Sequence, residues 1–377
     1  MTSQSQGRLA SLDILRGFDL FCLVFFQPVL SSLARAMDND VLNTVMVQFR
    51  HVSWEGFVFW DLIMPLFMFM AGVSMPFAFK KYLGDGSRAK LYGRILKRVL
   101  LLWVFGMMCQ GNLMALDPSK IYFYSNTLQA IAAGYLISAV LLIHFSIRGQ
   151  LIVTFVLLLA YWAIMTFIGV GGYGKGDYSP DGNLAEYVDR VVLGRFRDGA
   201  IVTEQGIDFR TYRYTWILST LTFGATVMSG VFAGHILKSA SIKGVAKVTW
   251  LAGVGVALIL CGLLWSIQMP IVKKIWTSSM TLFSSGLCFL LMALFYYVID
   301  HLGKGGGLHW LKIYGMNSIL AYMIFSIVDF RSVIQSLFFG FEQYLGSFYQ
   351  PFVTLCSVSI IFGILYLLHK RRIFLKV

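Results

Sequence analysis

The chain of 377 residues is 58% hydrophobic and only 13% charged, with a mean hydropathy of +0.72. Long uncharged segments recur from one end to the other, which indicates an integral membrane protein and excludes a soluble globular domain. The net charge of +13 would suit a nucleic-acid partner, but no basic stripe with interleaved aromatic residues occupies a soluble face. We therefore expect no binding to nucleic acid.

Apolar runs of about 20 residues predict ten transmembrane helices. They cover residues 17–36, 57–79, 94–113, 126–146, 150–170, 214–237, 247–267, 277–299, 311–330 and 351–369. The sequence thus predicts an all-α, polytopic helix bundle that forms one integral-membrane domain, 1–377. Segment 333–349 is apolar but too short for a further span, and a re-entrant or interfacial segment is the alternative interpretation. The small-residue spacing of Gly230 and Gly234 predicts close helix packing.

Basic residues give an independent test of this topology, because Lys and Arg accumulate in cytoplasmic loops. With ten spans, one side of the membrane holds 19 of the 31 basic residues but only 4 of the 18 acidic ones. Both termini fall on that side and are therefore predicted to be cytoplasmic. The first apolar run is too long for a cleaved signal peptide and is expected to be retained as a span.

The five cysteines lie in or at the end of apolar segments without paired spacing. They are typical of small core residues, so the sequence predicts neither a disulfide framework nor a metal site.

The longest connection, residues 171–213, lies on the predicted outer side. It is polar and rich in glycine, and its stretch Leu184–Gly194 suits a short amphipathic helix. A loop of about 40 residues in a compact bundle is more often functional than idle. We interpret it as a lid or part of an acceptor site, with a plain solvated loop as the alternative.

Two titratable residues mark the second apolar run. His51 stands at its outer mouth, where an imidazole can accept a proton from an attacking amine or carry an acyl group; an interfacial histidine beside Trp54 is the alternative. Asp61 lies within the run, where a carboxylate needs a partner. In a helix, ten residues place it roughly 15 Å from His51. We therefore expect Asp61 to support a deeper neighbour and not to contact His51.

Other polar residues occupy the spans. Arg16 can form an ion-pair ladder with Asp13 at the inner end of the first span. The amides of Gln27 and Asn317 can stabilise an oxyanion or bond a neighbouring helix. Trp276 follows two lysines on the outer side, where it can stack on a sugar or anchor the interface.

Six blocks, in order and spread over nearly the whole chain, resemble the heparan-alpha-glucosaminide N-acetyltransferase family and its bacterial relatives. They are Ser11–Gly17, His51–Gly56, Asp61–Ser74, Leu128–Tyr135, Lys274–Ser279 and Gly315–Tyr322. The resemblance implies transfer of an acetyl group from cytoplasmic acetyl-CoA to the amine of a glucosamine-type sugar on the outer, periplasmic side. It also implies a multi-pass protein in the lipid bilayer of the bacterial inner membrane, and leaves a homodimer open.

The resemblance assigns expected roles to two residues. His51 takes the place of the family's active-site histidine, and Gln27 stands where the family has an asparagine, so it keeps an amide but cannot act as the base. With Asp61, these form the expected catalytic set. Independently of the resemblance, our hypothesis is that acetyl-CoA binds at Arg16, Arg94, Lys97, Arg98, Lys238 and Asn317. The sugar is expected at Trp54, Glu55 and Trp276.

Two departures from the mammalian enzyme bear on the acceptor. The segment between Gln27 and His51 is longer, and we expect no counterpart of the lumenal domain that precedes the first shared helix, so a heparan chain is not the expected acceptor. The competing hypothesis is an amino-sugar or oligosaccharide transporter that uses His51 and Asp61 for proton coupling. The lack of visible inverted repeats disfavours it, and a scaffolding role would not explain a carboxylate within a span.

Overall fold

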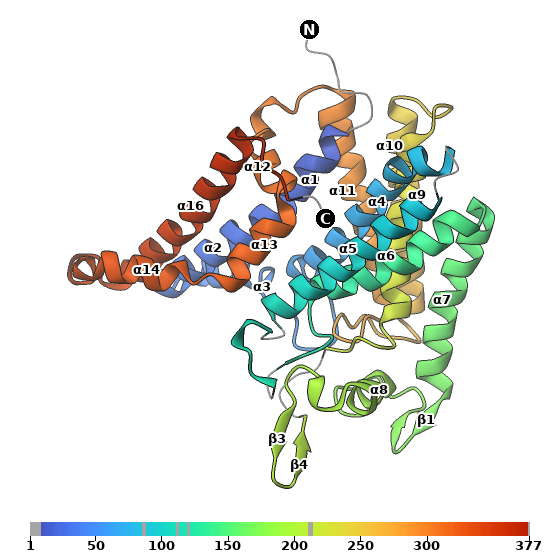
Figure 1. Ribbon diagram of the computed structural model, residues 1–377, viewed down its shortest axis with the longest axis horizontal. Coiled ribbons are helices and arrows are strands. Elements are labelled where there is room, and N and C mark those ends of the chain that lie inside the picture. The colour runs from blue at the N-terminus through green and yellow to red at the C-terminus, as the bar shows by residue number, and fades with distance from the viewer. Residues whose placement is uncertain (1–8, 85–87, 111–112, 119–120, 210–213, 376–377) are drawn as a thin grey trace. The chain divides into compact units, whose positions relative to one another are not determined.

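The computed structural model describes residues 9–84, 88–110, 113–118, 121–209 and 214–375. These residues are mostly helical, and their only strands form two short two-stranded sheets (Figure 1). The predicted all-α, polytopic class is confirmed. The last four residues of the predicted outer loop, 210–213, lie outside the described residues.

Eight helical segments of the described chain are long and apolar enough to cross a membrane. They are Ala10–Met37, Phe59–Lys80, Thr127–His144, Ile147–Phe167, Thr220–Lys238, Val245–Trp265, Ser278–His301 and Phe339–Lys370. Each coincides with one of the ten predicted spans, which supports a multi-pass membrane protein.

The other two predicted spans differ from expectation. The span predicted at 94–113 is the helix α5 (Arg88–Cys109), whose first half is rich in Lys and Arg and which is not among the eight. The span predicted at 311–330 is broken into α12 (Leu311–Met316) and α13 (Ser318–Ile327), and the chain then bends by 59° into α14 (Phe330–Leu337). Counting this bent pair as one span gives nine in the described residues.

A local cap explains the bend. The Asp329 carboxylate accepts the backbone N–H groups of Arg331 and Ser332 at 3.1 and 3.3 Å. These bonds satisfy donors that the first turn of a helix leaves without intrahelical partners. A new helix therefore begins at Phe330 in a new direction.

Packing divides the chain into two compact units. Unit 1 joins the two ends of the sequence and consists of Met1–His51, Val58–Ile63 and Leu294–Lys376. Besides α12, α13 and α14 it contains α1 (Ala10–Phe21), the π-helical turn Cys22–Phe26, α2 (Gln27–Met37), α3 (Asp40–Val47), the 3-10 turn Phe59–Leu62, α15 (Glu342–Leu345) and α16 (Tyr349–Lys370).

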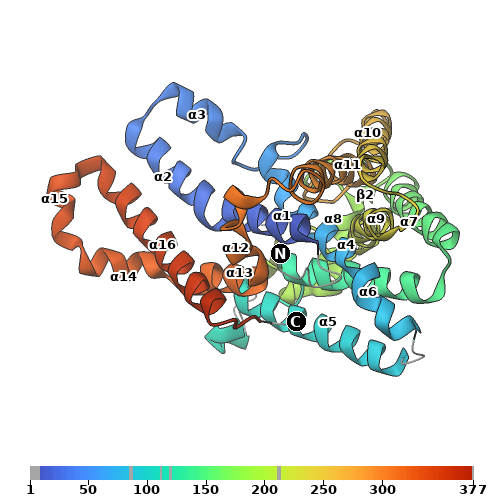
Figure 2. The ribbon, with the colours of Figure 1, turned by 90° about the horizontal axis from the view of Figure 1, so that it is seen from above.

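Within unit 1, α1 packs on α12, while α2 and α14 both pack on α16, so the blue and red parts of the chain lie side by side (Figure 2). The crossing of α1 and α12 requires glycine on both helices. A Cβ on Gly17 would lie 1.9 Å from the carbonyl oxygen of Leu311, and one on Gly315 would lie 2.1 Å from that of Asp13.

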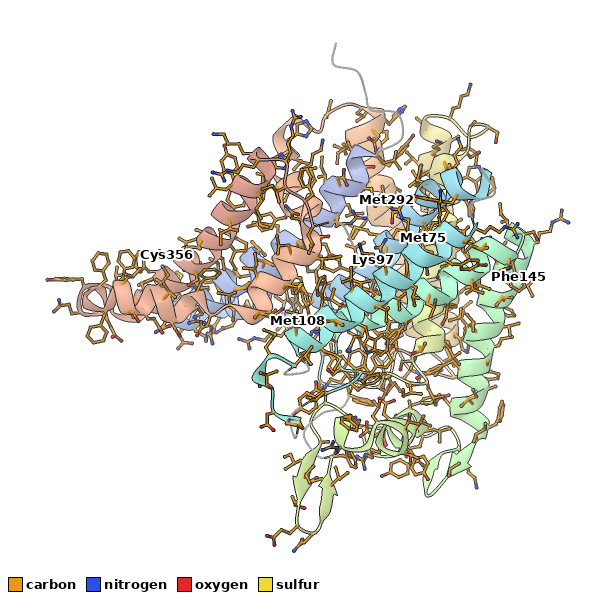
Figure 3. The ribbon with its side chains drawn as sticks, in the orientation of Figure 1. Met75, Lys97, Met108, Phe145, Met292 and Cys356 are labelled. Atoms are coloured by element: carbon orange, nitrogen blue, oxygen red, sulfur yellow. The ribbon has the colours of Figure 1, made fainter. Side chains whose placement is uncertain are left out.

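Unit 2 consists of Val52–Phe57, Met64–Ala293 and the last residue of the chain. Its long helices are α4 (Ile63–Gly84), α5, α6 (Thr127–His144), α7 (Ile147–Phe167), α9 (Thr220–Lys238), α10 (Val245–Trp265) and α11 (Ser278–Phe295). Met75 of α4 and Met292 of α11, both labelled in Figure 3, are buried in its core. The close packing predicted at Gly230 is confirmed, because a Cβ there would lie 1.9 Å from the carbonyl oxygen of Phe69 on α4.

The long connection between α7 and α9 is folded. It contains a hairpin of β1 (Gly169–Val170) and β2 (Tyr173–Gly174), the helix α8 (Leu184–Leu193), and a second hairpin of β3 (Ile201–Thr203) and β4 (Gly206–Asp208). These elements lie beyond one end of the long helices of unit 2 (Figure 1). The helix predicted at 184–194 is confirmed.

A buried polar cluster ties α8 to the segment before α9. The Asp189 carboxylate accepts the backbone N–H groups of Trp216 and Ile217 at 2.7 and 2.9 Å. On the same helix, Glu186 forms an ion pair with the fully buried guanidinium of Arg197. Burial raises the pKa of Asp189 to about 7, partly offset by the two N–H groups.

We expect this carboxyl group to make stability depend on pH. Because its pKa in the folded protein lies above the ordinary value, its contribution is fully present at low pH and is lost as the pH rises through about 7. The thermal unfolding midpoint of the wild type should therefore fall between about pH 4 and pH 7, and Asp189→Asn should flatten that slope. Glu204→Gln, at an exposed hairpin tip, is the control and should keep the wild-type slope. If Asp189→Asn also kept the wild-type slope, the pH dependence would belong to another group.

Candidate active site

His51 and Asp61 are in direct contact. His51 Nδ1 lies 2.6 Å from Asp61 Oδ1, and both residues belong to unit 1. The expectation that Asp61 is too far along the helix to reach His51 is therefore wrong. It assumed a helix through both residues, whereas helical structure begins only with the 3-10 turn at Phe59, and α4 follows at Ile63.

The backbone before and after the turn holds the two residues together. Gln48, just after α3, accepts the N–H of Trp60 on its carbonyl oxygen at 2.9 Å and the N–H of Phe59 on its side-chain Oε1 at 3.2 Å. Asp61 bonds back to Val58 in both directions: its N–H donates to the Val58 carbonyl at 3.0 Å, and its Oδ2 accepts the Val58 N–H at 3.2 Å. These bonds fix the orientation of the Asp61 carboxylate independently of its contact with His51.

Burial separates the roles of the two side chains. The Asp61 side chain is 1% exposed, and that of His51 is 40% exposed. When His51 donates its Nδ1 proton to the buried carboxylate, the lone pair of the neutral ring lies on Nε2. A histidine held in this way can take a proton from a nucleophile, and the carboxylate stabilises the imidazolium that forms.

Gln27 is linked to the same segment. It is the first residue of α2, directly after the π-helical turn Cys22–Phe26, and its Nε2 donates to the carbonyl oxygen of Phe49 at 3.4 Å. A π-turn inserts a residue into a helix and so re-aims the side chains that follow. The amide predicted to assist catalysis therefore contacts the backbone two residues before His51.

The segment after His51 is held within unit 2. Trp54 donates its indole N–H to the Tyr178 carbonyl at 2.9 Å, and Lys274 donates to the Ser53 carbonyl at 2.7 Å while its ammonium lies 5.9 Å from the Trp54 ring centroid. Glu55 forms a backbone bridge to Val272 and keeps an exposed side chain. Tyr178 lies in the long connection, so Trp54 adjoins the predicted outer loop.

Two predicted site residues are placed differently. Trp276 is 1% exposed, and its indole N–H donates to the Thr226 hydroxyl at 3.0 Å. Such a ring offers no open face to a sugar, so the expected stacking does not fit the structure. Asn317 is 1% exposed at the break between α12 and α13, where its amide bonds the backbone of Ile373 and Leu375 at 3.0 and 2.9 Å. It secures the C-terminal segment.

The basic residues expected to hold the acyl donor lie mainly in unit 2. Arg98 stacks 4.4 Å from the Tyr135 ring centroid, and its Nε is buried without a hydrogen-bond partner among the described residues. Arg94 donates to the Tyr82 hydroxyl, while Lys97, labelled in Figure 3, is exposed on α5. Lys238 is engaged by the Pro76 carbonyl at 2.7 Å.

Arg16, the remaining residue of that expected set, belongs to unit 1. Its guanidinium lies 3.9 Å from the Asp13 carboxylate, which is the predicted ion pair.

Two residues that hold the segments around the 3-10 turn and after His51 have contacts that the sequence does not indicate. Gln48 belongs to no motif, and only the fold of the turn reveals its bonds to Phe59 and Trp60. Lys274 belongs to one of the family blocks, but nothing in the sequence indicates its bond to the Ser53 carbonyl. Gly56 has a positive φ of 116°, which glycine adopts readily and a helix does not contain. This glycine is the feature of the sequence that indicates a turn, and not a continuous helix, between His51 and Asp61.

Fold and site together define a multi-pass membrane protein with a histidine–carboxylate pair suited to proton transfer. Residues 8–178 match the family model described as "Heparan-alpha-glucosaminide N-acetyltransferase, catalytic". That range contains Gln27, His51 and Asp61. The resemblance inferred from the sequence blocks is thereby confirmed.

Two curated proteins are similar along almost the whole chain. The heparan-alpha-glucosaminide N-acetyltransferase of Mus musculus is 24% identical over 421 residues, which cover 99% of this chain and 61% of that protein. The protein of the same name from Homo sapiens is 26% identical over 424 residues, covering 98% of this chain and 60% of its own length. The chain thus spans about three fifths of the length of these relatives.

Proposed function

We propose that this protein is a transmembrane acetyltransferase, which moves an acetyl group from cytoplasmic acetyl-CoA to the amine of a glucosamine-type sugar on the outer side of a bacterial inner membrane. The observation that carries the proposal is the 2.6 Å contact between His51 and the buried Asp61. The names of the two relatives support the choice of reaction and of sugar.

In the proposed reaction, His51 Nε2 takes the proton of the attacking amine as its nitrogen bonds to the thioester carbonyl carbon. Asp61 keeps the ring oriented and stabilises its positive charge. The carbon–sulfur bond then breaks, the acetyl group stays on the sugar nitrogen, and His51 returns the proton to the thiolate of CoA. A thioester is already activated, so the main tasks are to hold the reactants together and to remove one proton.

We propose that basic residues of α5 bind the phosphates of the donor. Arg98 has a buried Nε without a described partner. Arg94 and Lys97 lie on the same helix, α5. This helix therefore has guanidinium and ammonium groups that can bind phosphates. Lys238 fits less well, because the Pro76 carbonyl already occupies its ammonium. Trp54, which bonds the long connection at Tyr178, and its exposed neighbour Glu55 are proposed to contact the sugar.

The test uses purified protein in vesicles, with labelled acetyl-CoA on one side and glucosamine on the other. Labelled N-acetylglucosamine should form in the sugar compartment and depend on both substrates. Sugar accumulation without binding or turnover of acetyl-CoA would instead identify the transporter.

A further inference from the structure

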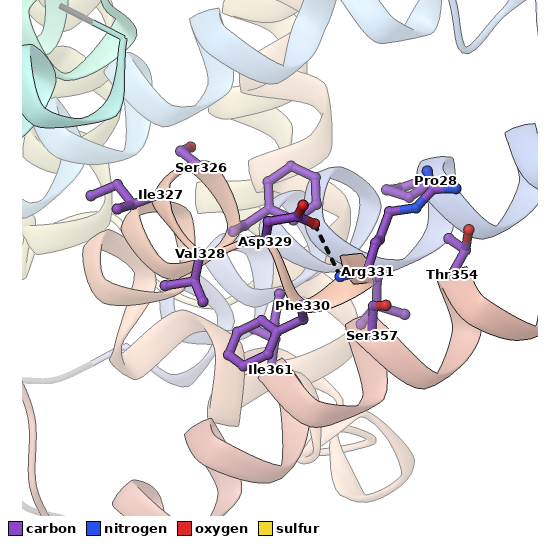
Figure 4. A pocket seen from close by; sticks show the side chains of 12 residues that line it. Pro28, Ser326, Ile327, Val328, Asp329, Phe330, Arg331, Thr354, Ser357 and Ile361 are labelled. Carbon is purple, nitrogen blue, oxygen red and sulfur yellow. Dashed lines mark hydrogen bonds between the residues drawn. The ribbon is translucent and has the colours of Figure 1, made fainter. Parts of the chain in front are cut away.

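A pocket of about 320 Å³ opens in unit 1 at the bend between α13 and α14 (Figure 4). Its wall is formed by Pro28 of α2, by the bend itself at 325–331, and by Thr354, Ser357, Val358 and Ile361 of α16. A pocket of this size can hold a small polar group and its immediate attachment. None of the catalytic or substrate-binding residues proposed above lines it.

The floor of the pocket provides hydrogen-bond acceptors. Thr354 and Ser357 are 3% and 4% exposed. Their hydroxyls donate to the carbonyls of Gln350 and Val353 on the same helix, at 2.8 and 2.6 Å. Since each hydroxyl has used its proton, its oxygen can only accept further bonds. Such a surface suits a ligand that donates N–H groups.

The rim carries one negative and one positive group, both held in place. The Asp329 carboxylate is fixed by the cap on α14, including the bond to the Arg331 N–H that Figure 4 marks. The Arg331 guanidinium donates to Gln350 Oε1 at 2.8 Å, which uses one of its five N–H donors. A ligand that complements the rim has a cationic amine for Asp329 and an anionic group for Arg331.

The surroundings of the pocket are apolar and exposed. Ile327 and Val328 on the rim are 40% and 44% exposed, and Leu337 and Phe339 on the following segment are 71% and 73% exposed. In a multi-pass protein, an amphipathic helix with such side chains suits the membrane interface. The complementary ligand therefore comes from the bilayer.

We propose that this pocket binds the phosphoethanolamine headgroup of a membrane phospholipid. Its phosphate pairs with Arg331, and its primary ammonium donates to Asp329 and to the hydroxyl oxygens of Thr354 and Ser357. The acyl chains lie along the exposed apolar residues. Phosphatidylcholine has the same charges but no N–H to donate, and phosphatidylglycerol has no amine, so both complement the site less well.

Binding can be measured by native mass spectrometry of the full-length protein with added lipids. Phosphatidylethanolamine should bind about tenfold more tightly than phosphatidylcholine or phosphatidylglycerol, the difference expected for a charge-assisted hydrogen bond. Free phosphoethanolamine at the same concentration should not displace it. Equal binding of the three lipids would overturn the proposal, and displacement by free phosphoethanolamine would assign the pocket to a soluble ligand instead.

Two variants test the contributions of Asp329 and Arg331 to lipid binding separately. Asp329→Asn keeps a good helix cap and should abolish the preference for phosphatidylethanolamine over phosphatidylcholine. Arg331→Gln should weaken both lipids about tenfold. Arg35→Gln, an exposed basic residue of α2, is the control and should bind as the wild type does. Wild-type binding and preference in both pocket variants would exclude this site, and the headgroup comparison in the wild type needs no variant at all.

Discussion

His51→Ala is expected to lower acetyl transfer by about 10²- to 10⁴-fold, the usual contribution of a positioned general base. The imidazole is the partly exposed member of the pair, with its Nδ1 engaged by Asp61. Removing it leaves no group at this position to accept the proton of the attacking amine. The measurement is the rate of labelled N-acetylglucosamine formation by purified protein in vesicles.

The control for this variant is His309→Ala, which removes an exposed imidazole from the same unit. It should retain the wild-type rate, and both variants should bind acetyl-CoA as the wild type does. Full turnover in His51→Ala would place the base elsewhere. Equal losses in both variants would point to a general effect of histidine removal on the protein.

Asp61→Asn is expected to reduce kcat by about 10²- to 10⁴-fold, because an amide can donate to Nδ1 and so favour the ring tautomer that lacks a lone pair on Nε2. The substitution nearly preserves shape, so KM for either substrate should change little. A pure effect on kcat separates positioning of His51 from loss of binding. The pH profile of kcat should also shift, since the carboxylate no longer stabilises the imidazolium.

Asp40→Asn is the matched control, because Asp40 is an exposed carboxylate in the first turn of α3 in the same unit. Its kcat and pH profile should equal those of the wild type. If Asp61→Asn raised KM with kcat unchanged, Asp61 would act in binding and not through His51. A variant that fails to fold is recognised by its thermal unfolding, and Asp61→Glu then tests whether a carboxylate restores kcat.

The helical class followed directly from the sequence, since apolar runs of about 20 residues suffice to define spans. The same rule failed at α5 and at 311–330 for different reasons. In α5 the basic first half lies inside the helix, so charge did not mark the helix end. At 311–330, the side chains of Asn317 and Asp329 bond backbone groups, and such bonds leave no trace in hydropathy.

For the site, the sequence by itself supplied the residue types and, through the family blocks, the expected importance of His51, Gln27 and Asp61. It could not pair His51 with Asp61, because a distance along the chain becomes a distance in space only when the backbone path is known. The tertiary structure decided that path: Gln48 bonds the turn at Phe59 and Trp60.

Burial was likewise beyond the sequence. Trp276 was expected at a surface because it follows two lysines, yet packing places its ring inside unit 2 with its N–H on Thr226. Composition and spacing determine which titratable and polar side chains each span carries. Only the packing of segments distant in sequence decides which of them meet and which remain open to a substrate, because those contacts depend on the whole fold and not on local pattern.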